Sequence, residues 1–576
     1  MQTENLDFSF LRDQTIGIDS VINTPFGQRL MVYCDFTASG RCLKFVEEYL
    51  MHIQRHYANT HTEDDITGKN MTHLLHQAEK IIKNSVNAGP GGKIICSGAG
   101  STGAIYRFQQ IVGTALSPAT RSFLLNVHKE FIKENPNADF FEFMNSYKPV
   151  IFVGPYEHHS NEISWRESLA VVKRVNLAPD GSIDLNHLEE LLQKPEYQNR
   201  MRIGSFSAAS NVTGIKTPVH DIARLLHKYN ALACFDYAAS APYVRIDMNP
   251  DPGKKGGDPS IDAIFISPHK FLGGPGSCGV LVFNDKIYHK DLAPSISAGG
   301  TVLYVNPVTQ EYFSDIEERE KAGTPGVLQT LKAGMAFDIK DKLTPEKIEQ
   351  RELELLNMAF DFWKQNPNIE ILGNQDPEKR VAIVSFIIKD PWKKHLHPKF
   401  ITALLNDLFG IQSRAGCSCA GPYGHILLNI DINTSVRYRS CIVNGNEGMK
   451  PGWCRVGFHY TMDNEEAMYV IKAIDFVARK GYMFLPLYNF HLDSGFWEHK
   501  EDSLISMGLS VDEAMNIADK PVNQCLPPDV RYRLYNSYLD EADKLSLELK
   551  HELPEKMPTL EGELEQLRYF SFVNVV

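Results

Sequence analysis

The sequence lacks the features that mark membrane, secreted and nucleic-acid-binding proteins. No uninterrupted apolar stretch reaches the roughly 20 residues that a membrane-spanning helix needs. Residues 1–10 carry two acidic residues and no basic one, so we expect no secretory signal peptide. Positive charge is also scarce. The 71 acidic residues outnumber 59 basic ones, and the formal net charge of −12 gives no electrostatic reason to bind nucleic acid or anionic lipid.

A disulfide framework is absent as well. The ten cysteines are scattered over 576 residues, and this spacing fits free thiols in a reducing compartment better than paired cysteines. We therefore expect a cytoplasmic protein. The length predicts two or three domains, and the 43% hydrophobic and 23% charged residues are typical of a soluble globular chain.

Short apolar runs alternate with helical patterns between about residues 90 and 285. The predicted strands are 93–96, 150–153, 171–175, 202–206, 231–235, 263–266 and 279–283. Between two of them, a predicted helix places Ile222, Leu225 and Leu226 on one face. This alternation predicts a doubly wound, mostly parallel α/β sheet covered on both faces. Ligands of such sheets bind beyond the carboxyl ends of the strands.

The rest of the chain is predicted to add a smaller α+β domain. Residues 462–480 form an amphipathic helix, with Asp463 and Glu466 suited to an N-terminal capping box and Gly481 suited to cap the end. An acidic helical tail is expected at 539–567. We expect four segments, namely 1–89 packing on the active site, 90–334 as the large α/β domain, 335–485 as the α+β domain and 486–576 as an extension of unknown role.

Lys270 is the first candidate for chemistry. It follows the predicted strand 263–266 and precedes the glycine-rich segment 273–276. A lysine held in a tight loop at a strand end is partly desolvated, so its amine deprotonates more easily and can form a Schiff base with an aldehyde. A surface lysine in a loop is the alternative. Other polar residues at strand ends of the same sheet favour the chemical interpretation.

Residues 98–103 have the spacing of a GxGxxG phosphate-binding loop, between a predicted strand and a helix. As a signal for a nicotinamide site the motif is weak, because residues 117–126 offer no strand-end acid for a ribose. The hydroxyls of Ser101 and Thr102 suit a single phosphate monoester better than a pyrophosphate. A glycine-rich turn without a ligand is the alternative.

Two further strand ends carry polar side chains. Asp236 ends the run 231–235, and a buried carboxylate there needs a cationic or donor partner. A protonated pyridine nitrogen is one such partner, and its charge makes the ring an electron sink. His158 and His159 follow another strand, where an imidazole can stack on an aromatic ring and move protons.

Cys417 and Cys419 lie in a glycine-containing loop that begins at Arg414. Such a loop beside an arginine can expose a thiol and lower its pKa. A Cys-x-Cys metal site is the alternative, but it needs further ligands, and the sequence shows no second cysteine or histidine pair at suitable spacing. We therefore predict no metal site.

In this order the motifs resemble class V (fold-type I) pyridoxal-phosphate enzymes, closest in pattern to the cysteine desulfurase and selenocysteine lyase branch. The resemblance covers about residues 28–485 and includes the segment 33–39. It implies a fold-type I transferase, pyridoxal 5′-phosphate as cofactor, an amino-acid substrate and a homodimer. The sequence departs from the group at Ala239, where many desulfurases have glutamine, and at Thr62, where the group often has arginine.

The resemblance also implies roles for the candidate residues. Lys270 would form the Schiff base with the cofactor, Asp236 would pair with its pyridinium, and His158 would stack on its ring. The phosphate would be bound by Ser101, Thr102, Ser267, His269 and, from the partner subunit, Thr324. Asn211 would lie near the cofactor hydroxyl or the substrate carboxylate, and Arg455 would bind that carboxylate through its bidentate fork.

We name residues 414–422, which contain Cys417 and Cys419, the thiol loop. It resembles the family loop whose cysteine accepts sulfur, and Cys419 matches that cysteine by position. The catalytic residues implied are therefore Lys270, His158 and Cys419, acting in a cysteine desulfurase that passes sulfur to an acceptor protein. Cys417 would either resolve a persulfide or be a bystander. Selenocysteine lyase, transamination, epimerisation and Cβ-lyase chemistry are alternatives on the same cofactor, and a non-catalytic scaffold is an alternative of another class.

Overall fold

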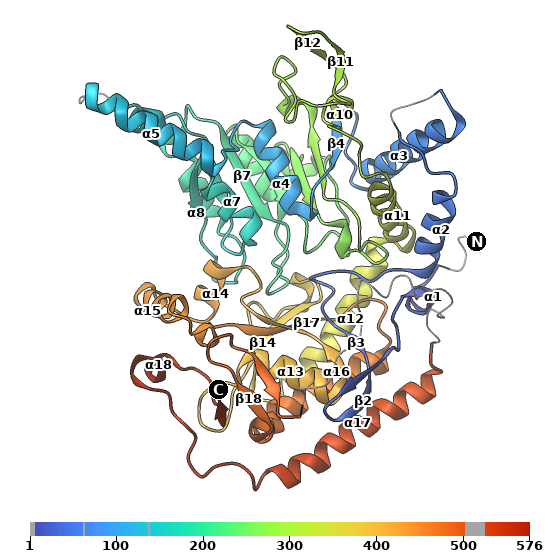
Figure 1. Ribbon diagram of the computed structural model, residues 1–576, viewed down its shortest axis with the longest axis vertical. Helices are drawn as coiled ribbons and strands as arrows, with labels where there is room; N and C mark the ends of the chain where they lie inside the picture. The colour runs from blue at the N-terminus through green and yellow to red at the C-terminus, as the bar shows by residue number, and fades with distance from the viewer. Residues whose placement is uncertain (1–5, 61–63, 136–138, 502–524) are drawn as a thin grey trace. The chain divides into compact units, whose positions relative to one another are not determined.

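The structure is a computed structural model that describes residues 6–60, 64–135, 139–501 and 525–576 (Figure 1). The chain divides into two compact units. The first, which we name the lysine unit, comprises residues 39–210 and 215–346. The second, the thiol unit, comprises residues 1–38, 211–214 and 347–576. Each unit is therefore assembled from segments that are separated along the sequence.

A seven-stranded sheet forms the centre of the lysine unit, in the order β4-β10-β9-β8-β7-β5-β6. Its strands are β4 (Gly92–Cys96), β5 (Val150–Val153), β6 (Val171–Arg174), β7 (Arg202–Ser207), β8 (Leu232–Asp236), β9 (Ala263–Ile266) and β10 (Val280–Asn284). Five neighbouring strands are parallel, and β10 alone runs antiparallel, against β9 on one side and β4 on the other. The predicted, mostly parallel α/β sheet is confirmed.

The strand predictions succeed because this sheet is buried. All seven expected strands are present, and no boundary differs by more than one residue. Every residue of β5, β7 and β9 is buried. Strands of a sheet covered on both faces form near-continuous apolar runs, and these are easy to find in a sequence.

Helices and a hairpin complete the lysine unit. The helices are α2 (Lys44–Gln54), α3 (Ile66–Ser85), α4 (Gly100–Ile111), α5 (Pro118–Glu134), α6 (Phe140–Asn145), α7 (Ile163–Arg166), α8 (Leu185–Leu192), α9 (Val219–Lys228), α10 (Ile316–Arg319) and α11 (Val327–Leu343), and the hairpin strands are β11 (Val302–Val305) and β12 (Gln310–Tyr312). The expected apolar face of α9 is present, with Ile222 and Leu226 buried and Leu225 half-buried.

The thiol unit contains a four-stranded antiparallel sheet in the order β13-β14-β17-β16. These strands are β13 (Ile369–Ile371), β14 (Ile383–Ile388), β16 (Arg414–Gly416) and β17 (Trp453–Gly457). The helices of the region are α12 (Pro345–Trp363), α13 (Pro398–Phe409), α14 (Gly421–Leu427), α15 (Ile432–Val443) and α16 (Asn464–Lys480). The N-terminal segment adds α1 (Phe8–Gln14), the hairpin β1 (Val21–Thr24) and β2 (Gly27–Leu30), and β3 (Val32–Tyr33), which pairs in parallel with β15 (Ile411–Gln412).

Helix α16 has the two expected residues, Asp463 and Gly481, at its N-cap and C-cap positions. The Asp463 carboxylate accepts a hydrogen bond from the Glu466 amide at 2.8 Å, as an N-cap should. Gly481 occupies the predicted C-cap position, where its amide donates to the Val477 carbonyl, but its φ is −56° and not left-handed, and the chain continues directly into a 3-10 helix. A Cβ at Gly481 would lie 2.9 Å from Val477 Cγ1, so this glycine permits close packing.

The described residues after 486 contribute apolar side chains to the core of the thiol unit. Strands β18 (Tyr488–Phe490), β19 (Trp497–His499) and β20 (Asn574–Val575) make a three-stranded sheet. The predicted tail helix over 539–567 is partly wrong, since α17 (Pro528–Leu549) begins earlier and is separated from α18 (Gly562–Leu567). Pro554 and Pro558 lie in the intervening segment and disfavour a continuous helix.

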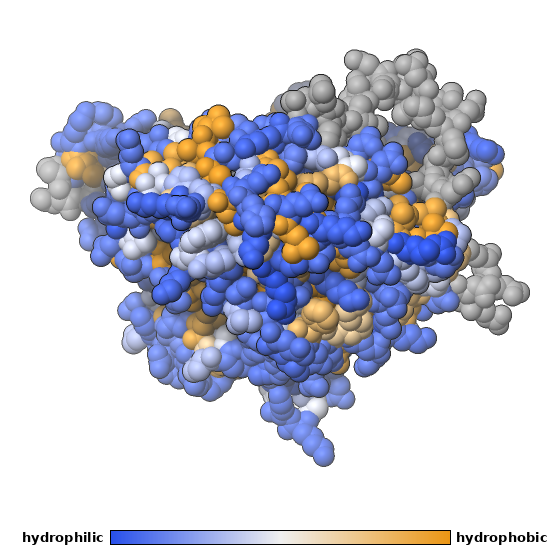
Figure 2. All heavy atoms as spheres, turned by 90° about the horizontal axis from the view of Figure 1, so that it is seen from below, coloured by the Kyte–Doolittle hydropathy of each residue, from blue (hydrophilic) through white to orange (hydrophobic). Residues whose placement is uncertain are grey.

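The surface agrees with the composition. On the face seen in Figure 2, most residues are hydrophilic and the hydrophobic ones form separate small patches. Among the helices of the described residues, none combines the length and the apolar character needed to cross a bilayer.

Candidate active site

Four sequence-predicted positions of the lysine unit follow strands at the same edge of the sheet. Asp236 ends β8, Lys270 comes four residues after β9, and His158 comes five residues after β5. Ser101 lies in the first turn of α4, beyond the end of β4. Strand β4 has the same direction as β9, because both are antiparallel to β10. The carboxyl ends of these strands therefore place the four residues together.

Asp236 is a buried carboxylate, with 3% of its surface exposed. Its Oδ1 accepts a hydrogen bond from the Ala238 amide at 2.9 Å, and the Ser101 hydroxyl also bonds to the carboxylate. Burial raises the pKa of Asp236, while the Ala238 amide, the charge of Lys270 and Ser101 oppose the rise. No basic group of the described residues lies within ion-pair distance of this carboxylate. It can therefore accept a cationic ligand group.

Lys270 is held in a tightly packed turn. It ends a short 3-10 helix (Pro268–Lys270), and its amide donates to the Ser267 carbonyl at 3.0 Å. A Cβ at Gly274 would lie 1.9 Å from the Pro268 carbonyl oxygen, and one at Gly40 would lie 2.0 Å from the Phe271 carbonyl oxygen. Only glycine fits at these two positions, so the close approach of backbone segments fixes the base of the lysine side chain.

His269 lies beside Lys270 and is neutral at physiological pH. Burial, together with the positive charge of Lys270, lowers the pKa of His269 to about 4. Its ring packs against the glycine-rich loop, where a Cβ at Gly100 would lie 2.7 Å from His269 Cε1 and 2.7 Å from Ser267 Oγ. The loop also bonds directly to this segment, because the Ser101 amide donates to Ser267 Oγ at 2.8 Å.

His158 is oriented by a residue that the sequence analysis missed. The Ser160 amide donates to His158 Nδ1 at 3.2 Å, and Ser160 Oγ lies 3.1 Å from the same nitrogen. The amide bond makes Nδ1 an acceptor, so a neutral His158 carries its proton on Nε2. Ser160 Oγ is also 2.6 Å from Thr102 Oγ1 and so links the histidine to the predicted phosphate loop. In the sequence, this role is indicated by a serine two residues after the histidine.

Glu157 was also missed, although it precedes His158 directly. Its buried carboxylate accepts hydrogen bonds from Gly154 N at 3.1 Å, Ser207 N at 2.9 Å, Ser207 Oγ at 2.7 Å and Asn161 Nδ2 at 2.7 Å. Burial raises the pKa of Glu157 to about 7 against these donors. The residue ties the segment that carries His158 to strand β7. Nothing in the local sequence distinguishes it from an exposed glutamate.

Arg455 of the thiol unit lies in β17 and is 4% exposed. Its Nη2 is 2.9 Å from Asp35 Oδ1, and its Nη1 donates to the Asn211 carbonyl at 3.0 Å. The other oxygen of Asp35 binds Arg414 Nε at 2.8 Å. Asp35 therefore orients two guanidinium groups, a role that the sequence analysis did not assign to it.

Asn211 connects this arginine to the thiol loop. Its Nδ2 donates to the Ser418 carbonyl at 2.7 Å. Its Oδ1 is buried and has no hydrogen-bond partner. A buried acceptor without a donor is costly, by about 1–3 kcal/mol, so the atom suits a donor group supplied by a ligand.

The thiol loop is a strained turn that exposes one cysteine. The Ala420 amide donates to the Cys417 carbonyl at 3.0 Å, and the two central residues, Ser418 and Cys419, have φ values of 50° and 55°. Each such residue costs on the order of 1–3 kcal/mol, and the surroundings must hold it. Trp453 Nε1 donates to Ser418 Oγ at 3.2 Å. Cys419 is exposed, whereas Cys417 is half-buried.

The remaining predicted positions add little to these clusters. Thr324 is exposed, and its hydroxyl accepts from Asn59 Nδ2 at 3.4 Å. Ala239 is buried and offers no side-chain donor. Thr62 lies outside the described residues. The described part of the chain contains no group of three or more histidine, cysteine, aspartate or glutamate side chains placed to hold a metal ion.

Comparisons with known proteins agree with this arrangement. Residues 145–470 match the family described as aminotransferase class-V. A probable cysteine desulfurase of Halalkalibacterium halodurans is 28% identical over 301 residues, which are 52% of this chain and 67% of the relative. One of Streptomyces coelicolor is 24% identical over 399 residues, which are 68% of this chain and 84% of the relative.

Solved structures share the fold at lower identity. A cysteine desulfurase of Escherichia coli has a TM-score of 0.60 at 18% identity and covers 82% of this chain and 98% of its own. One of Thermococcus onnurineus has a TM-score of 0.60 at 19% identity and covers 78% of this chain and 95% of its own. Because the family match spans more than half of the 576 residues, the chain belongs to the aminotransferase class-V family, whose members are pyridoxal 5′-phosphate-dependent enzymes.

Proposed function

We propose that the protein is a cysteine desulfurase that converts L-cysteine to L-alanine and keeps the sulfur as a persulfide on Cys419. Family membership and the named relatives support an enzyme of this class. The observation that carries the proposal is the thiol loop itself. A cysteine exposed at the tip of a turn with two residues at positive φ is presented to solvent at a cost in strain.

The lysine unit suits pyridoxal phosphate. Asp236 is a buried carboxylate that accepts hydrogen bonds from the Ala238 amide and the Ser101 hydroxyl and forms no ion pair among the described residues. A protonated pyridine nitrogen would be a suitable cationic partner for it. Lys270 would hold the aldehyde carbon. The phosphate would be held by Ser101, Thr102, Ser267 and His269, at a loop that only glycine can form at position 100. When bound, the cofactor supplies an electron sink for negative charge next to the substrate amino group.

We assign the other predicted residues to substrate binding and proton transfer. The Lys270 amine removes the proton from the substrate Cα. The Nε2–H of His158 is available as a proton donor. Arg455, whose guanidinium is oriented by Asp35, binds the substrate carboxylate. The Asn211 Oδ1, which has no donor of its own, accepts from a polar group of the ligand.

Cys419 carries the sulfur step. Its thiolate attacks the sulfur of the substrate, a sulfur–sulfur bond forms, and the bond from that sulfur to Cβ breaks. The electron pair of the broken bond stays with Cβ, which takes up a proton. One cysteine and one protein thiol are thus converted to one alanine and one protein persulfide, and no external oxidant or reductant is consumed.

The test is alanine formation from L-cysteine by the purified holoenzyme, with the persulfide located by mass spectrometry. We expect Cys419→Ser to abolish the persulfide and to lower alanine release by about 10²–10⁴-fold. Cys525→Ser is the matched control, since Cys525 is also exposed but lies outside the loop. Undiminished activity of Cys419→Ser without added thiol would remove Cys419 from the reaction. A 2-oxo acid product would instead favour transamination on the same cofactor.

The assembly and location of the protein are also part of the proposal. We expect a homodimer in which Thr324 of one subunit reaches the phosphate bound by the other, and transfer of the sulfur from the enzyme to an acceptor. A cytoplasmic location agrees with ten cysteines that are all free. Sedimentation of the holoenzyme at increasing dilution tests the dimer, and loss of cofactor on dissociation would link the dimer to Thr324.

A further inference from the structure

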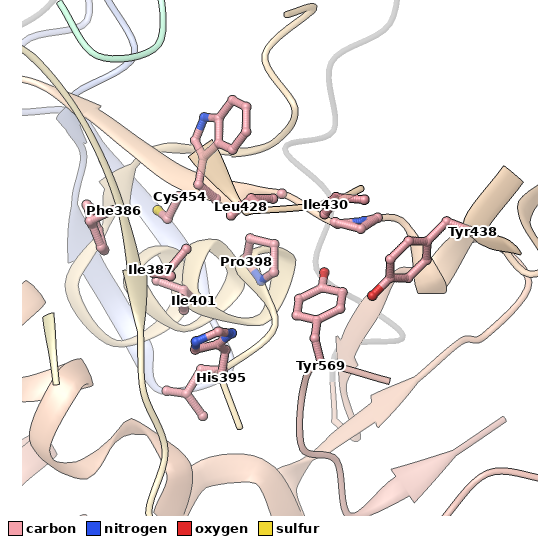
Figure 3. Close-up of a pocket in the computed structure, with 14 residues that line it drawn as sticks. Phe386, Ile387, His395, Pro398, Ile401, Leu428, Ile430, Tyr438, Cys454 and Tyr569 are labelled. Atoms are coloured by element: carbon pink, nitrogen blue, oxygen red, sulfur yellow. The ribbon is translucent and has the colours of Figure 1, made fainter. Parts of the chain in front are cut away.

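Two adjoining cavities lie in the thiol unit next to the thiol loop. The larger measures about 240 Å³ and is lined by Cys417 together with residues of α14, α15 and β17. The smaller measures about 100 Å³. Both are lined by Leu428, Ile430, Tyr438, Pro451 and Trp453. Figure 3 shows the smaller cavity, with aliphatic side chains around it and the rings of Tyr438 and Tyr569 on one side.

Apart from Cys417 and two basic residues, the walls of the larger cavity are apolar or already hydrogen-bonded. His425 lies 2.8 Å from the Gly421 carbonyl oxygen through Nδ1 and 2.7 Å from Ser435 Oγ through Nε2. The Tyr438 hydroxyl donates to the Leu567 carbonyl at 2.7 Å. These polar groups hold the wall in shape and leave an apolar interior. A volume of about 240 Å³ is below the range of roughly 300–1,000 Å³ of drug-sized sites, so a compact ligand fits best.

Two basic residues line the cavity and are exposed to solvent. Neither Arg439 nor Lys450 forms an ion pair within 4 Å with an acidic group of the described residues. Arg437, two residues before Arg439 on the same helix, binds Glu563 Oε1 at 2.8 Å. Helix α15 therefore carries one arginine bound to the protein and one that remains available. Apolar walls with two available cations suit a small molecule that carries a negative charge.

Cys417 connects this cavity to the proposed reaction. It lines the cavity, and it begins the turn that carries Cys419 at its third position. Cys419 itself is not among the lining residues. The two thiols are thus two residues apart in one turn, and Cys417 is the one that lines the cavity.

We propose that the cavity binds a small anionic thiol as sulfur acceptor and that Cys417 relays the sulfur to it. This inference rests on the proposed desulfurase function. The Cys417 thiolate attacks the outer sulfur of the Cys419 persulfide, so that a persulfide forms on Cys417 and Cys419 leaves as a thiolate. The acceptor thiolate then attacks the outer sulfur on Cys417, leaves as a persulfide and restores the Cys417 thiolate. Both steps exchange one sulfur–sulfur bond for another.

The experiment compares two acceptors of similar size, anionic 3-mercaptopropionate and neutral 2-mercaptoethanol. The holoenzyme is loaded with L-cysteine, and discharge of the persulfide is followed by the mass of the acceptor product and by the mass of the loop peptide. We expect saturable discharge by the anionic thiol, with a half-saturating concentration about tenfold lower than for the neutral thiol.

The variants locate the site. Arg439→Gln combined with Lys450→Gln is expected to raise the half-saturating concentration of 3-mercaptopropionate about tenfold and to change that of 2-mercaptoethanol less than about twofold. Arg437→Gln, which removes the bound arginine of the same helix, is the control and should leave both values unchanged. Cys417→Ser is expected to slow discharge by the anionic thiol and to let the persulfide accumulate on Cys419.

The outcomes separate this inference from the function on which it rests. If no alanine and no persulfide form, the proposed function fails and the relay fails with it. If both form but the two thiols discharge the persulfide equally, or the double variant behaves like Arg437→Gln, only the cavity assignment is overturned. If neither thiol discharges the persulfide, the acceptor is a macromolecule and the small-molecule site is likewise overturned.

Discussion

The Lys270 turn and the thiol loop are built in opposite ways. The Lys270 turn lies between segments that approach so closely that only glycine fits at positions 40 and 274. The thiol loop places Cys419 in solvent, and Gly416 within it has open space around its Cβ position. One segment is fixed by packing, and the other is shaped by two residues at positive φ and a few hydrogen bonds.

This difference follows the chemistry proposed for each segment. A lysine that moves a proton works best where close packing fixes its position. A cysteine that accepts sulfur and gives it away must be reached by successive partners, so exposure is required. We expect substitutions near Lys270 to affect cofactor binding and stability, and substitutions in the thiol loop to affect transfer of the sulfur.

The largest expected effect is that of Lys270→Ala. Loss of the amine should lower alanine formation by about 10⁴-fold or more, because the variant cannot hold the cofactor covalently or move the Cα proton. Borohydride reduction of the wild-type holoenzyme followed by peptide mapping should locate a pyridoxyl group on the peptide that contains Lys270. Lys290→Ala, at an exposed lysine of the same unit, is the control. A pyridoxyl group on another lysine would refute the assignment.

Asp35 offers a test of the thiol unit that does not touch the thiols. Its carboxylate binds the buried Arg455 and the half-exposed Arg414. Asp35→Asn should lower the free energy of unfolding by about 3 kcal/mol, because the buried charge of Arg455 then loses the carboxylate that pairs with it. Arg414→Gln removes the exposed partner of the same carboxylate and should cost less than about 1 kcal/mol.

Thermal unfolding of both variants measures the difference, and the KM for cysteine gives a second readout. If Arg455 binds the substrate carboxylate, KM should rise in Asp35→Asn and stay close to the wild-type value in Arg414→Gln. Equal destabilisation by the two substitutions would contradict the view that burial decides the strength of these pairs.

Local patterns predicted the sheet and its strand-end residues well. The runs that became β5 and β9 are continuous and apolar and are flanked by residues of other kinds, so their limits could be located to the residue. Asp236 ends β8, Ser267 and Lys270 follow β9, and the ends of these parallel strands meet at one edge.

Contacts between residues far apart in the sequence could not be predicted. The ion pair of Asp35 with Arg455 joins residues 420 positions apart. The stacking of Tyr535 on Tyr469, with ring centroids 4.1 Å apart, and the ion pair of Arg531 with Asp463 at 2.7 Å bring α17 onto α16. The sequence gives the types of these residues but not their neighbours. Gly481 shows the same limit, since its packing against Val477 is visible only in three dimensions.

Substitutions at Gly100 and Gly113 of the lysine unit distinguish the stability cost of backbone strain from that of close packing. Both have positive φ, at 55° and 73°, so alanine is strained at either position. A Cβ at Gly100 would also lie 2.7 Å from His269 Cε1, whereas one at Gly113 meets nothing within 4 Å. Gly100→Ala should therefore cost about 1–3 kcal/mol more than Gly113→Ala. Thermal unfolding and retention of cofactor measure this, and equal costs would mean that the loop yields to the added methyl group.

The smallest expected effect concerns the titration of His269. Burial and Lys270 lower its pKa from 6.5 to about 4 in the folded protein, so between these values the unfolded chain binds a proton that the folded protein does not. The contribution of His269 to stability is complete above pH 6.5 and is lost as the pH falls toward 4. His269→Gln should therefore show a smaller decrease in unfolding temperature between pH 7.5 and pH 5 than the wild type. His289→Gln replaces an exposed histidine of the same unit and should show the same decrease in unfolding temperature as the wild type. An equal decrease in all three proteins would mean that His269 lies in solvent and not against the glycine-rich loop of residues 98–103.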